Sequence, residues 1–349
     1  MFTIVMYHYV RPIRNSNYPA IKGLELENFR GQLDYLQHHY ELLTFGHLHD
    51  LIHAGDPIPP KACLLSFDDG LGDHALHVFP ELRKRGLSGM FFPPAKAVLE
   101  HHVLDVHKIH FILAVNPDYK AVKAELIRHL HDYQGMDGMP TVESLEEQFA
   151  SANRLLNPDE RFIKYVLQKG IPRPVRNEIC TELFRSHVTT EEASFAKELY
   201  ASLDQLHDMY ENGMEIGGHT HCHDWLATMT DEEQANEIKA TVDLLARIIG
   251  EQPRNWVMSY PCGSYNQTTI SLLKANGCSF GCTSVPEMAD PQKPFELDRL
   301  DTIDFPCRRD ADPVSWTLCT NGANLLDDSS PRSQAPLLER MKEQKTVGR

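Results

Sequence analysis

The stretch Leu64-Leu65-Ser66-Phe67-Asp68-Asp69-Gly70 decides the fold that this sequence predicts. Its apolar start, together with Cys63, is typical of a buried strand, and two adjacent carboxylates follow just before a glycine that permits a sharp turn. In parallel α/β folds, functional side chains gather at the carboxyl ends of strands, where the following loops converge. Asp and Gly are also common turn residues, so a plain turn is the alternative for this stretch alone.

A second polar stretch, Gly217-Gly218-His219-Thr220-His221-Cys222-His223-Asp224, lies far along the chain. It follows the short apolar segment Met214-Glu215-Ile216, so its imidazoles are expected to meet beyond the end of a strand. Two His and one Asp suit Zn²⁺ or another divalent first-row metal and leave coordination positions open for water and substrate. An open site indicates catalysis. The alternative is a solvated or packed histidine cluster, because the chain contains 19 His.

Together the two stretches resemble the polysaccharide deacetylase family, the NodB-homology domains of carbohydrate esterase family four. The family's Thr-Phe-Asp-Asp-Gly motif corresponds to Ser66-Phe67-Asp68-Asp69-Gly70, and its His-Ser/Thr-x-x-His motif corresponds to His219-Thr220-His221-Cys222-His223. The surroundings agree as well, at Phe79-Pro80-Glu81-Leu82, Met90-Phe91-Phe92 and Gly213-Met214-Glu215-Ile216-Gly217. The resemblance covers about residues 1 to 96 and 205 to 305 and implies a distorted (β/α)7 barrel, an α/β fold.

The resemblance also implies roles for individual residues. Removal of an N-acetyl group needs a water nucleophile, a base, stabilisation of the carbonyl oxygen and an acid for the leaving amine. By resemblance, Asp68 is the base, and Asp69, His219 and His223 hold a divalent metal, with Zn²⁺ the first choice and Co²⁺, Ni²⁺, Mn²⁺ or Fe²⁺ as alternatives. His221 is expected to face elsewhere if the segment is helical, because positions four apart share one face of a helix.

The third family stretch, usually Arg-x-Pro-Tyr, departs here to Ser259-Tyr260-Pro261-Cys262. The backbone N–H of Cys262 can still serve the oxyanion, because a main-chain donor does not depend on the side chain. The family's arginine, which orients the base, is missing. Arg299, in Leu297-Asp298-Arg299-Leu300-Asp301, is the candidate to replace it, and the alternative is that Arg299 is an ordinary surface residue.

The family's C-terminal Leu-x-x-His, which supplies the acid, is absent because no histidine follows His223. His8 is the candidate acid, since it ends the first predicted strand and the first and last strands of a closed barrel are neighbours. The poly-N-acetylglucosamine deacetylase branch has its acid histidine shifted to the N-terminal side in this way. The alternative is a purely structural role for His8.

Length and composition fit one enlarged enzyme domain, or a barrel with a second domain. The chain has 349 residues with 42% hydrophobic content, and its net charge of −15 argues against a nucleic-acid groove or an anionic membrane surface. Eight irregularly spaced Cys indicate reduced thiols and favour a cytoplasmic location. No apolar run approaches the ~18 residues of a membrane span, and the N-terminus lacks the basic start of a signal peptide.

Strands and helices are expected to alternate as a parallel barrel requires. Strands are predicted at 3–7, 42–43, 88–92, 256–260 and 279–283, besides the strand that carries the acids. Helices are predicted at 26–39, 77–85, 230–249 and 268–275, the third opening with the capping box Thr230-Asp231-Glu232-Glu233.

Residues 97–204 differ from the rest in their helical texture. Helical patterns are predicted at 119–133, 142–156, 159–167, 176–184 and 191–203. The expected organisation is a discontinuous barrel from 1–96 and 205–320, a helical insertion at 97–204 and a polar tail at 321–349. A lid, a substrate-recognition surface, a dimerisation arm and a mere elaboration are all open for the insertion.

The sequence therefore predicts a metal-dependent hydrolase that removes an N-acetyl group from an acetylated amino sugar in a polysaccharide, an oligosaccharide or a biosynthetic precursor. The expected partner is a carbohydrate, without nucleic acid or a membrane span. Two alternatives stay open. One is hydrolysis of another amide or a cyclic imide, and the other is a carbohydrate-binding protein with a degenerate site.

Overall fold

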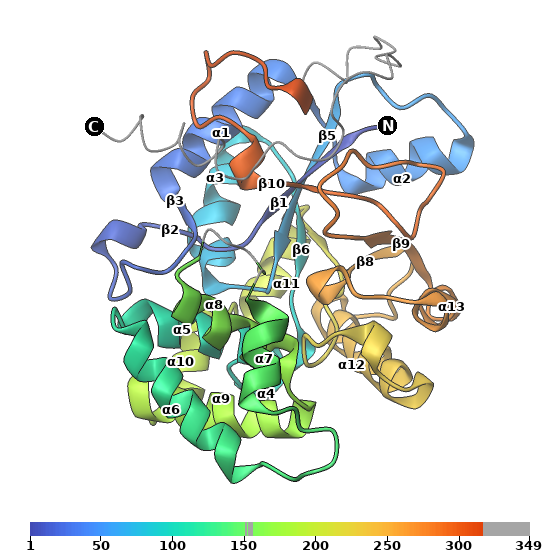
Figure 1. The fold of residues 1–349 in the computed structure, drawn as a ribbon. Coiled ribbons are helices and arrows are strands. Elements are labelled where there is room, and N and C mark those ends of the chain that lie inside the picture. The colour runs from blue at the N-terminus through green and yellow to red at the C-terminus, as the bar shows by residue number, and fades with distance from the viewer. Residues whose placement is uncertain (151, 153–155, 317–349) are drawn as a thin grey trace, which may run out of the picture. The chain divides into compact units, whose positions relative to one another are not determined.

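The computed structural model describes residues 1–150, 152 and 156–316, which form two compact units (Figure 1). Unit 1 consists of Met1–Ile13, Gly23–His102 and the described part of Ala193–Leu325. Among the described residues, unit 2 consists of Arg14–Lys22 and Val103–Glu192. The tail expected at residues 321–349 lies outside the described residues.

Unit 1 is built around short parallel strands, several of which are labelled in Figure 1. In chain order they are β1 Thr3–Tyr7, β4 Glu41–Leu42, β5 Ala62–Asp68, β6 Met90–Phe92, β7 Glu215–Ile216, β8 Trp256–Ser259, β9 Cys278–Cys282 and β10 Leu300–Asp301. The hydrogen-bonded order is β10-β1-β5-β6-β7, with β4 beside the start of β5, and β8 pairs separately with β9. A further two-residue ladder joins β2 Val10–Arg11 to β3 Leu24–Glu25.

Two single parallel bridges join these pieces into a ring. Gly218, just after β7, pairs with Met258 of β8, and Leu297, just before β10, pairs with Cys282 of β9. Within the described residues the order is therefore β1-β5-β6-β7-β8-β9-β10 and back to β1. The predicted distorted (β/α)7 barrel is confirmed. Its strand pairing is most irregular at these two single bridges, which we call the seams of the ring.

Consecutive glycines permit the seam between β7 and β8. A Cβ atom on Gly217 would lie 2.4 Å from the carbonyl oxygen of Val257, and one on Gly218 would lie 2.4 Å from Cγ2 of Thr241. Both distances are far below van der Waals contact, so only glycine allows the backbone to come this close to its neighbours.

The helices of unit 1 lie outside and at the ends of this ring. They are α1 Leu26–His39, α2 Phe45–Ala54, α3 Phe79–Arg85, α4 Ala95–Glu100, α11 Leu203–Glu211, α12 Asp231–Ile249 and α13 Gln267–Ala275, with a π-helical turn at His74–Val78. Short 3-10 turns occur at Ile13–Asn15, Leu226–Thr228, Pro261–Gly263 and Thr302–Asp304. Helix α10, Glu192–Leu199, begins where unit 2 ends.

Local sequence sets the ends of the longest helix, α12. Thr230 accepts a hydrogen bond from the backbone N–H of Glu233, whose side chain in turn accepts from the backbone of Thr230. This reciprocal arrangement satisfies N–H groups that have no partner inside the helix. Gly250, with φ of 86°, closes the other end in the left-handed conformation that favours glycine. The helix predicted at 230–249 is confirmed.

The strands of the ring have apolar residues on both faces, because alternate side chains belong to two different packed layers. The layer inside the ring contains Ile4, Leu64, Phe92, Val257, Phe280 and Leu297, and α2 adds Phe45 and Leu48 to it. The layer between ring and helices contains Val5, Cys63, Leu65, Phe67, Phe91 and Trp256 together with Leu33 and Leu245. Ser66 and Asp68 alternate with Leu65 and Phe67, so their side chains point into the ring like that of Leu64.

Unit 2 is helical in its described residues. Its elements are α5 Asp105–Val115, α6 Tyr119–Asp132, α7 Val142–Phe149, α8 Pro158–Tyr165, a π-helical turn at Val166–Gly170 and α9 Arg173–His187. Lys108 is a fully buried charge of this unit: its ammonium lies 3.1 Å from a Glu192 carboxylate oxygen and donates to the Thr181 hydroxyl.

Several sequence expectations differ from these elements. Helices α2, α4 and α5 are not predicted by the sequence patterns. The helix expected over 142–156 ends at Phe149, and residues 151 and 153–155 of that range are outside the described part of the chain. The helix expected over 191–203 ends at Leu199, and the next helix, α11 Leu203–Glu211, lies beyond that range and is not predicted.

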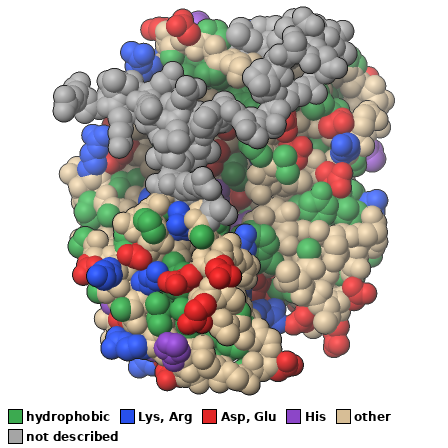
Figure 2. Space-filling model, viewed as in Figure 1, with side chains coloured by type: hydrophobic (Ala, Val, Ile, Leu, Met, Phe, Trp, Pro, Cys, Tyr) green, Lys and Arg blue, Asp and Glu red, His purple; other side chains and the backbone are tan. Residues whose placement is uncertain are grey.

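The surface of the helical unit carries both signs of charge. Figure 2 shows acidic and basic side chains interspersed over its visible face. Among the residues that the structure describes, none of the helices combines the length and the apolar character needed to cross a bilayer. The seven cysteines in the described residues are free thiols, and Cys319 lies outside them.

Candidate active site

The two acids at the end of β5 have different backbone conformations. Asp68 is the last residue of the strand, and its side chain points into the ring. Asp69 follows with φ of 76°, and Gly70 with φ of 60°. A Cβ on Gly70 would also lie 2.7 Å from Cα of Pro93. The tight turn therefore requires glycine, and it gives the two buried carboxylates different neighbours.

Asp68 is held by Arg299 in a two-pronged ion pair. Nη1 and Nη2 of Arg299 donate to the two carboxylate oxygens of Asp68, each at 2.8 Å. Arg299 is 1% exposed, so this guanidinium is a core residue and the surface alternative for it is wrong. Its Nε donates to the carbonyl of Thr283 at 2.8 Å, which fixes the plane of the fork.

The charge of Arg299 controls the protonation of Asp68. Burial by itself would raise the pKa of this carboxyl, but the guanidinium of Arg299 outweighs burial, with smaller contributions from His219 and His8, and lowers the pKa to about 2. Asp68 is therefore a carboxylate throughout the neutral range, and it is a weak base.

His219 and His223 meet at Asp69. Their Nε2 atoms lie 3.4 Å and 3.3 Å from Oδ1 of Asp69, and their rings meet edge to face. The segment is not helical, so the condition attached to His221 is not met, yet His221 does face elsewhere, toward Glu100. Thr220 and His223 instead adopt positive φ values of 62° and 57°, which turn the chain back.

The donor atoms of Asp69, His219 and His223 fit a divalent metal. Nδ1 of His219 donates to the carbonyl of Ser259 at 2.7 Å, which leaves the lone pair of Nε2 directed at Asp69. Two ligand atoms about 2.0 to 2.1 Å from a tetrahedral Zn²⁺ are about 3.3 to 3.4 Å apart. The distances from the two Nε2 atoms to Oδ1 of Asp69 match this separation. Without a cation, burial would lower the pKa of His223, but its contact with Asp69 outweighs burial and raises it.

His8 lies directly after β1, and β1 pairs with β10 as the closed barrel predicts. It is partly buried, and it contributes to the lowered pKa of Asp68. Its backbone carbonyl accepts a hydrogen bond from Nε2 of the buried His74 at 3.0 Å. His8 is thus held at the mouth of the ring beside the two acids.

Cys262 lies in the turn Pro261–Gly263 that follows β8. Its thiol is exposed, and its φ is 54°. Since Ser259 of β8 contacts both Asp68 and His219, this turn begins next to the site. Asp69, Thr220, His223 and Cys262 are four of the six non-glycine residues with positive φ in the described chain, and such conformations tend to gather at functional sites.

Comparison with known sequences identifies a family. A sequence model of the family described as polysaccharide deacetylase matches residues 184–281, which include His219 and His223. A protein of Bacillus subtilis (strain 168), YxkH, whose name places it among polysaccharide deacetylases, is 29% identical over 98 residues. Residues 184–281 are thus similar to polysaccharide deacetylases. The match covers 28% of this chain and 34% of YxkH, so the chain spans about a third of that relative.

Comparison with solved structures agrees on the fold. The Streptococcus pyogenes deacetylase PplD in complex with acetate has a TM-score of 0.52 and 15% identity to this chain. This chain is also similar to IcaB from Ammonifex degensii, with a TM-score of 0.52 and 18% identity. Each comparison covers 86% of this chain and 91% of the other.

Three hydroxyl residues to which the sequence analysis assigns no role support the site. The hydroxyl of Ser259 donates to Asp68 at 3.1 Å and accepts from Arg299 at 2.9 Å. Ser66 accepts from Arg299 at 3.3 Å, and Thr283 offers Arg299 its carbonyl. The only signal in the sequence is that Ser259 stands at the place of the arginine in the family motif that this stretch resembles, and the structure fills that place with Arg299 from just before β10.

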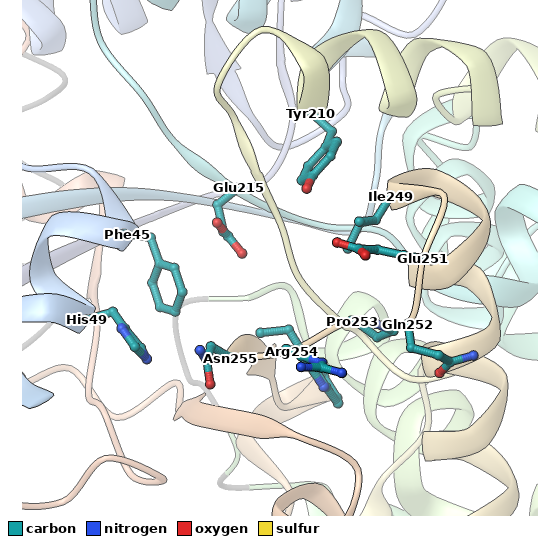
Figure 3. A pocket seen from close by; sticks show the side chains of 12 residues that line it. Phe45, His49, Tyr210, Glu215, Ile249, Glu251, Gln252, Pro253, Arg254 and Asn255 are labelled. Carbon is teal, nitrogen blue, oxygen red and sulfur yellow. The ribbon is translucent and has the colours of Figure 1, made fainter.

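A separate cavity of about 270 Å³ lies at the amino-terminal ends of β7 and β8 (Figure 3). Asp68, Asp69, His219 and His223 are not among its lining residues. Phe45, His49, Tyr210, Glu215 and Glu251 are among its lining residues. Burial raises the pKa of Glu215, the first residue of β7, to about 7. This cavity is not part of the site described above.

Proposed function

We propose that this chain is a metal-dependent hydrolase that removes N-acetyl groups from an acetylated amino sugar. One observation carries the proposal: Asp69, His219 and His223 converge directly beside a carboxylate, Asp68, that a buried arginine holds ionised. A metal triad next to a base suits metal-assisted hydrolysis of an amide.

Asp69, His219 and His223 would hold the cation. When bound there, a divalent cation supplies Lewis acidity, which polarises an amide carbonyl and acidifies water. Three protein ligands leave room in a tetrahedral coordination shell for the reacting groups. The carbonyl of Ser259 orients His219 for this task, because it fixes which ring nitrogen carries the proton.

Asp68 would accept the proton of the attacking water. The fork of Arg299 keeps this carboxylate ionised and fixed in orientation, so that it is always ready as an acceptor. Its pKa of about 2 makes it a weak base, so the water must be acidified before Asp68 can take its proton. This requirement supports the pairing of Asp68 with a metal site rather than hydrolysis by Asp68 alone.

Cys262 and His8 would complete the reaction. The backbone N–H of Cys262 is the proposed donor to the carbonyl oxygen as it gains negative charge, a role that does not use the thiol. His8 is the proposed acid for the leaving amine, supported by its place at the end of β1 close enough to Asp68 to affect its pKa. Proton delivery from His8 to the amine would keep the sugar nitrogen from leaving as an anion.

The comparisons support a carbohydrate as the substrate. The related PplD structure contains acetate, the product that deacetylation would release, and the matched family is named for polysaccharides. We therefore propose an N-acetylated amino sugar, in a polymer, an oligosaccharide or a precursor, as substrate. The free thiols of the described chain support a cytoplasmic location as part of the same proposal.

Acetate release from oligomers of N-acetylglucosamine, with metal content measured on the same samples, tests the proposal. Asp68→Asn should lower the rate by about 10²- to 10⁴-fold with metal retained. His219→Ala should lose activity together with the cation held by Asp69, His219 and His223, and chelation of the wild type should abolish acetate release until Zn²⁺ or Co²⁺ is restored. Asp132→Asn and His131→Ala, both exposed on α6, are the matched controls and should behave as wild type.

The alternatives predict other results. A carbohydrate-binding protein with a degenerate site would bind the oligomers and release no acetate in any metal form. A hydrolase of another amide or of a cyclic imide would show metal-dependent turnover of those compounds only. An unchanged rate of acetate release in Asp68→Asn would rule out the assigned base.

A further inference from the structure

A second cluster of metal-ligand atoms lies on the same segment as the two site histidines. One ligand atom each of His221, Cys222 and Glu237 lies within 4.8 Å of the others. Sγ of Cys222 is 3.2 Å from Nδ1 of His221, and Nδ1 is 4.0 Å from Oε1 of Glu237. None of these three residues takes part in the site proposed for hydrolysis.

Glu237 is fixed by the backbone of the segment. Its Oε2 accepts hydrogen bonds from the N–H groups of both His221 and Cys222, each at 2.8 Å. The carboxylate comes from α12 and is 7% exposed as a residue. Two charge-assisted bonds to one oxygen fix the position of the other oxygen, Oε1, on the side of the imidazole.

The imidazole of His221 is oriented by a second carboxylate. Its Nε2 lies 2.6 Å from Oε1 of Glu100, at the end of α4. A carboxylate can only accept, so Nε2 carries the proton and Nδ1 presents a lone pair toward Cys222 and Glu237. A histidine bonded to a carboxylate through one nitrogen and to a metal through the other is the usual arrangement at protein metal sites.

We propose that His221, Cys222 and Glu237 form a second metal site, which binds a borderline-soft divalent cation such as Zn²⁺ through nitrogen, sulfur and oxygen. Thiolate and imidazole ligands select such cations over Mg²⁺ or Ca²⁺. Tetrahedral Zn²⁺ would require about 3.5 Å between sulfur and nitrogen and about 3.4 Å between nitrogen and oxygen. The observed 3.2 Å and 4.0 Å approach these values after a shift of the ring by roughly half an ångström.

Binding at this site exchanges a proton for the cation. Cys222 is a free cysteine, and a thiol must lose its proton to become a metal ligand. On binding, the S–H bond breaks, the proton goes to solvent and the sulfur bonds to the cation. The ammonium of Lys96 is a neighbouring positive charge, and its repulsion opposes binding of the cation.

The consequence concerns the segment that carries the site histidines. His221 and Cys222 lie between His219 and His223, whereas Glu237 belongs to α12. A cation here would tie this non-helical segment to α12 and so stabilise the turn that presents His219 and His223. Its role is structural, and the proposal stands whether or not the first site hydrolyses acetyl groups.

Titration of the metal-free protein with Co²⁺, followed by absorption spectroscopy, distinguishes the two sites. Only a thiolate ligand gives the near-ultraviolet sulfur-to-cobalt charge-transfer band, and the first site contains no sulfur. We expect the band in wild type and in His219→Ala, and its loss in Cys222→Ser. Cys262→Ser, which removes an exposed thiol outside the cluster, should keep it. Zn²⁺ content should be two equivalents in wild type and one in either His219→Ala or Cys222→Ser.

A second variant covers the case in which Cys222→Ser does not fold. Glu100→Gln should keep the band at saturation while weakening Co²⁺ binding by about 10- to 100-fold, as loss of a carboxylate behind a histidine ligand does. Glu232→Gln, exposed on α12, is its control. The absence of the charge-transfer band in wild type, or its persistence in Cys222→Ser, would overturn the proposal.

Discussion

Arg299 is a fully buried cation, and its ion pair is with Asp68. Replacement by Met keeps much of the apolar volume but leaves the buried carboxylate without its counter-charge. We expect Arg299→Met to lower the free energy of unfolding by about 3 to 5 kcal/mol and to raise the pKa of Asp68. Urea denaturation measures the first effect, and acetate release should fall with it.

Two further variants separate charge from geometry at this position. Arg299→Lys retains a cation but loses the planar fork that bonds both oxygens of Asp68, so its stability should lie between wild type and Arg299→Met while turnover stays low. Arg309→Met, at an exposed arginine, is the control and should change stability by less than about 0.5 kcal/mol. If Arg299→Met is as stable as Arg309→Met, the ion pair between Arg299 and Asp68 does not stabilise the folded protein.

At this scale the sequence predicts residues with a distinctive chemistry better than the residues that support them. Asp69, His219 and His223 belong to recognisable motifs, and Arg299 follows from the absence of the arginine that the family has elsewhere. Ser259 contacts Asp68, His219 and Arg299, and this shared contact could not be predicted, because Ser259 lies 191 residues from Asp68 in the chain. Its role depends on the pairing of strands across the ring, which no local pattern records.

The seam between β7 and β8 depends on glycine. A Cβ on Gly218 would lie 2.4 Å from Thr241 and 2.8 Å from Trp256, both in the packed layer outside the ring. We expect Gly218→Ala to cost about 1 to 3 kcal/mol through overpacking, and to weaken metal binding because His219 follows directly. Chemical denaturation and metal content measure the two effects.

Gly46 provides the matched control for this substitution. A Cβ there would meet no atom within 4 Å, and Gly46 lies inside α2, where alanine is the better helix former. Gly46→Ala should therefore be neutral or stabilising by up to about 1 kcal/mol. Equal stabilities of Gly218→Ala and Gly46→Ala would contradict the steric account of the seam.

The elements that the sequence predicts well are those with strong local signals. Helix α12 has a capping box and a closing glycine, and β5 is continuously apolar. Helix α5 is missed because buried residues such as His107, Lys108 and Ile109 lie on nearly all its sides, so no amphipathic period appears. Helix α2 does have end signals, since Thr44 caps it and Gly55 closes it, but its histidines obscure the apolar pattern.

Strand β7 begins with Glu215, whose carboxyl points into the cavity of Figure 3. Burial raises its pKa from an ordinary 4.5 to about 7, so the folded state holds this proton more tightly than the unfolded state does. The resulting stability is complete below about pH 4.5 and is lost as the pH rises through about 7. The loss by pH 8 is at most about 3 kcal/mol.

Glu215→Gln cannot ionise and should remove this dependence. Its free energy of unfolding should exceed that of wild type at pH 8, and the difference should shrink at pH 5. Glu211→Gln, exposed at the end of α11, is the control and should show no such change between the two pH values. A difference between Glu215→Gln and wild type that is the same at both pH values would mean that Glu215 is not desolvated in the folded protein.

On the scale of the whole molecule, the chain forms two compact units rather than one continuous core. The sequence indicates a change of texture near residue 97 but not the boundary that the structure draws, because segment Arg14–Lys22 also belongs to unit 2. Tyr18 from that segment packs edge to face against Phe111 of α5, with ring centroids 4.8 Å apart. Such a contact, far apart in sequence, leaves no trace in a local pattern.

Two units with separate apolar cores should unfold in two steps. Leu64, inside the ring, and Leu183, in α9 of unit 2, are both fully buried, and either Leu→Ala change should cost about 2 to 5 kcal/mol. We expect scanning calorimetry to resolve two transitions, with Leu64→Ala lowering the temperature of one and Leu183→Ala that of the other. If both substitutions lower one shared transition by the same amount, the units unfold together. In that case the helical segment contributes to the stability of the barrel instead of being an independent addition to it.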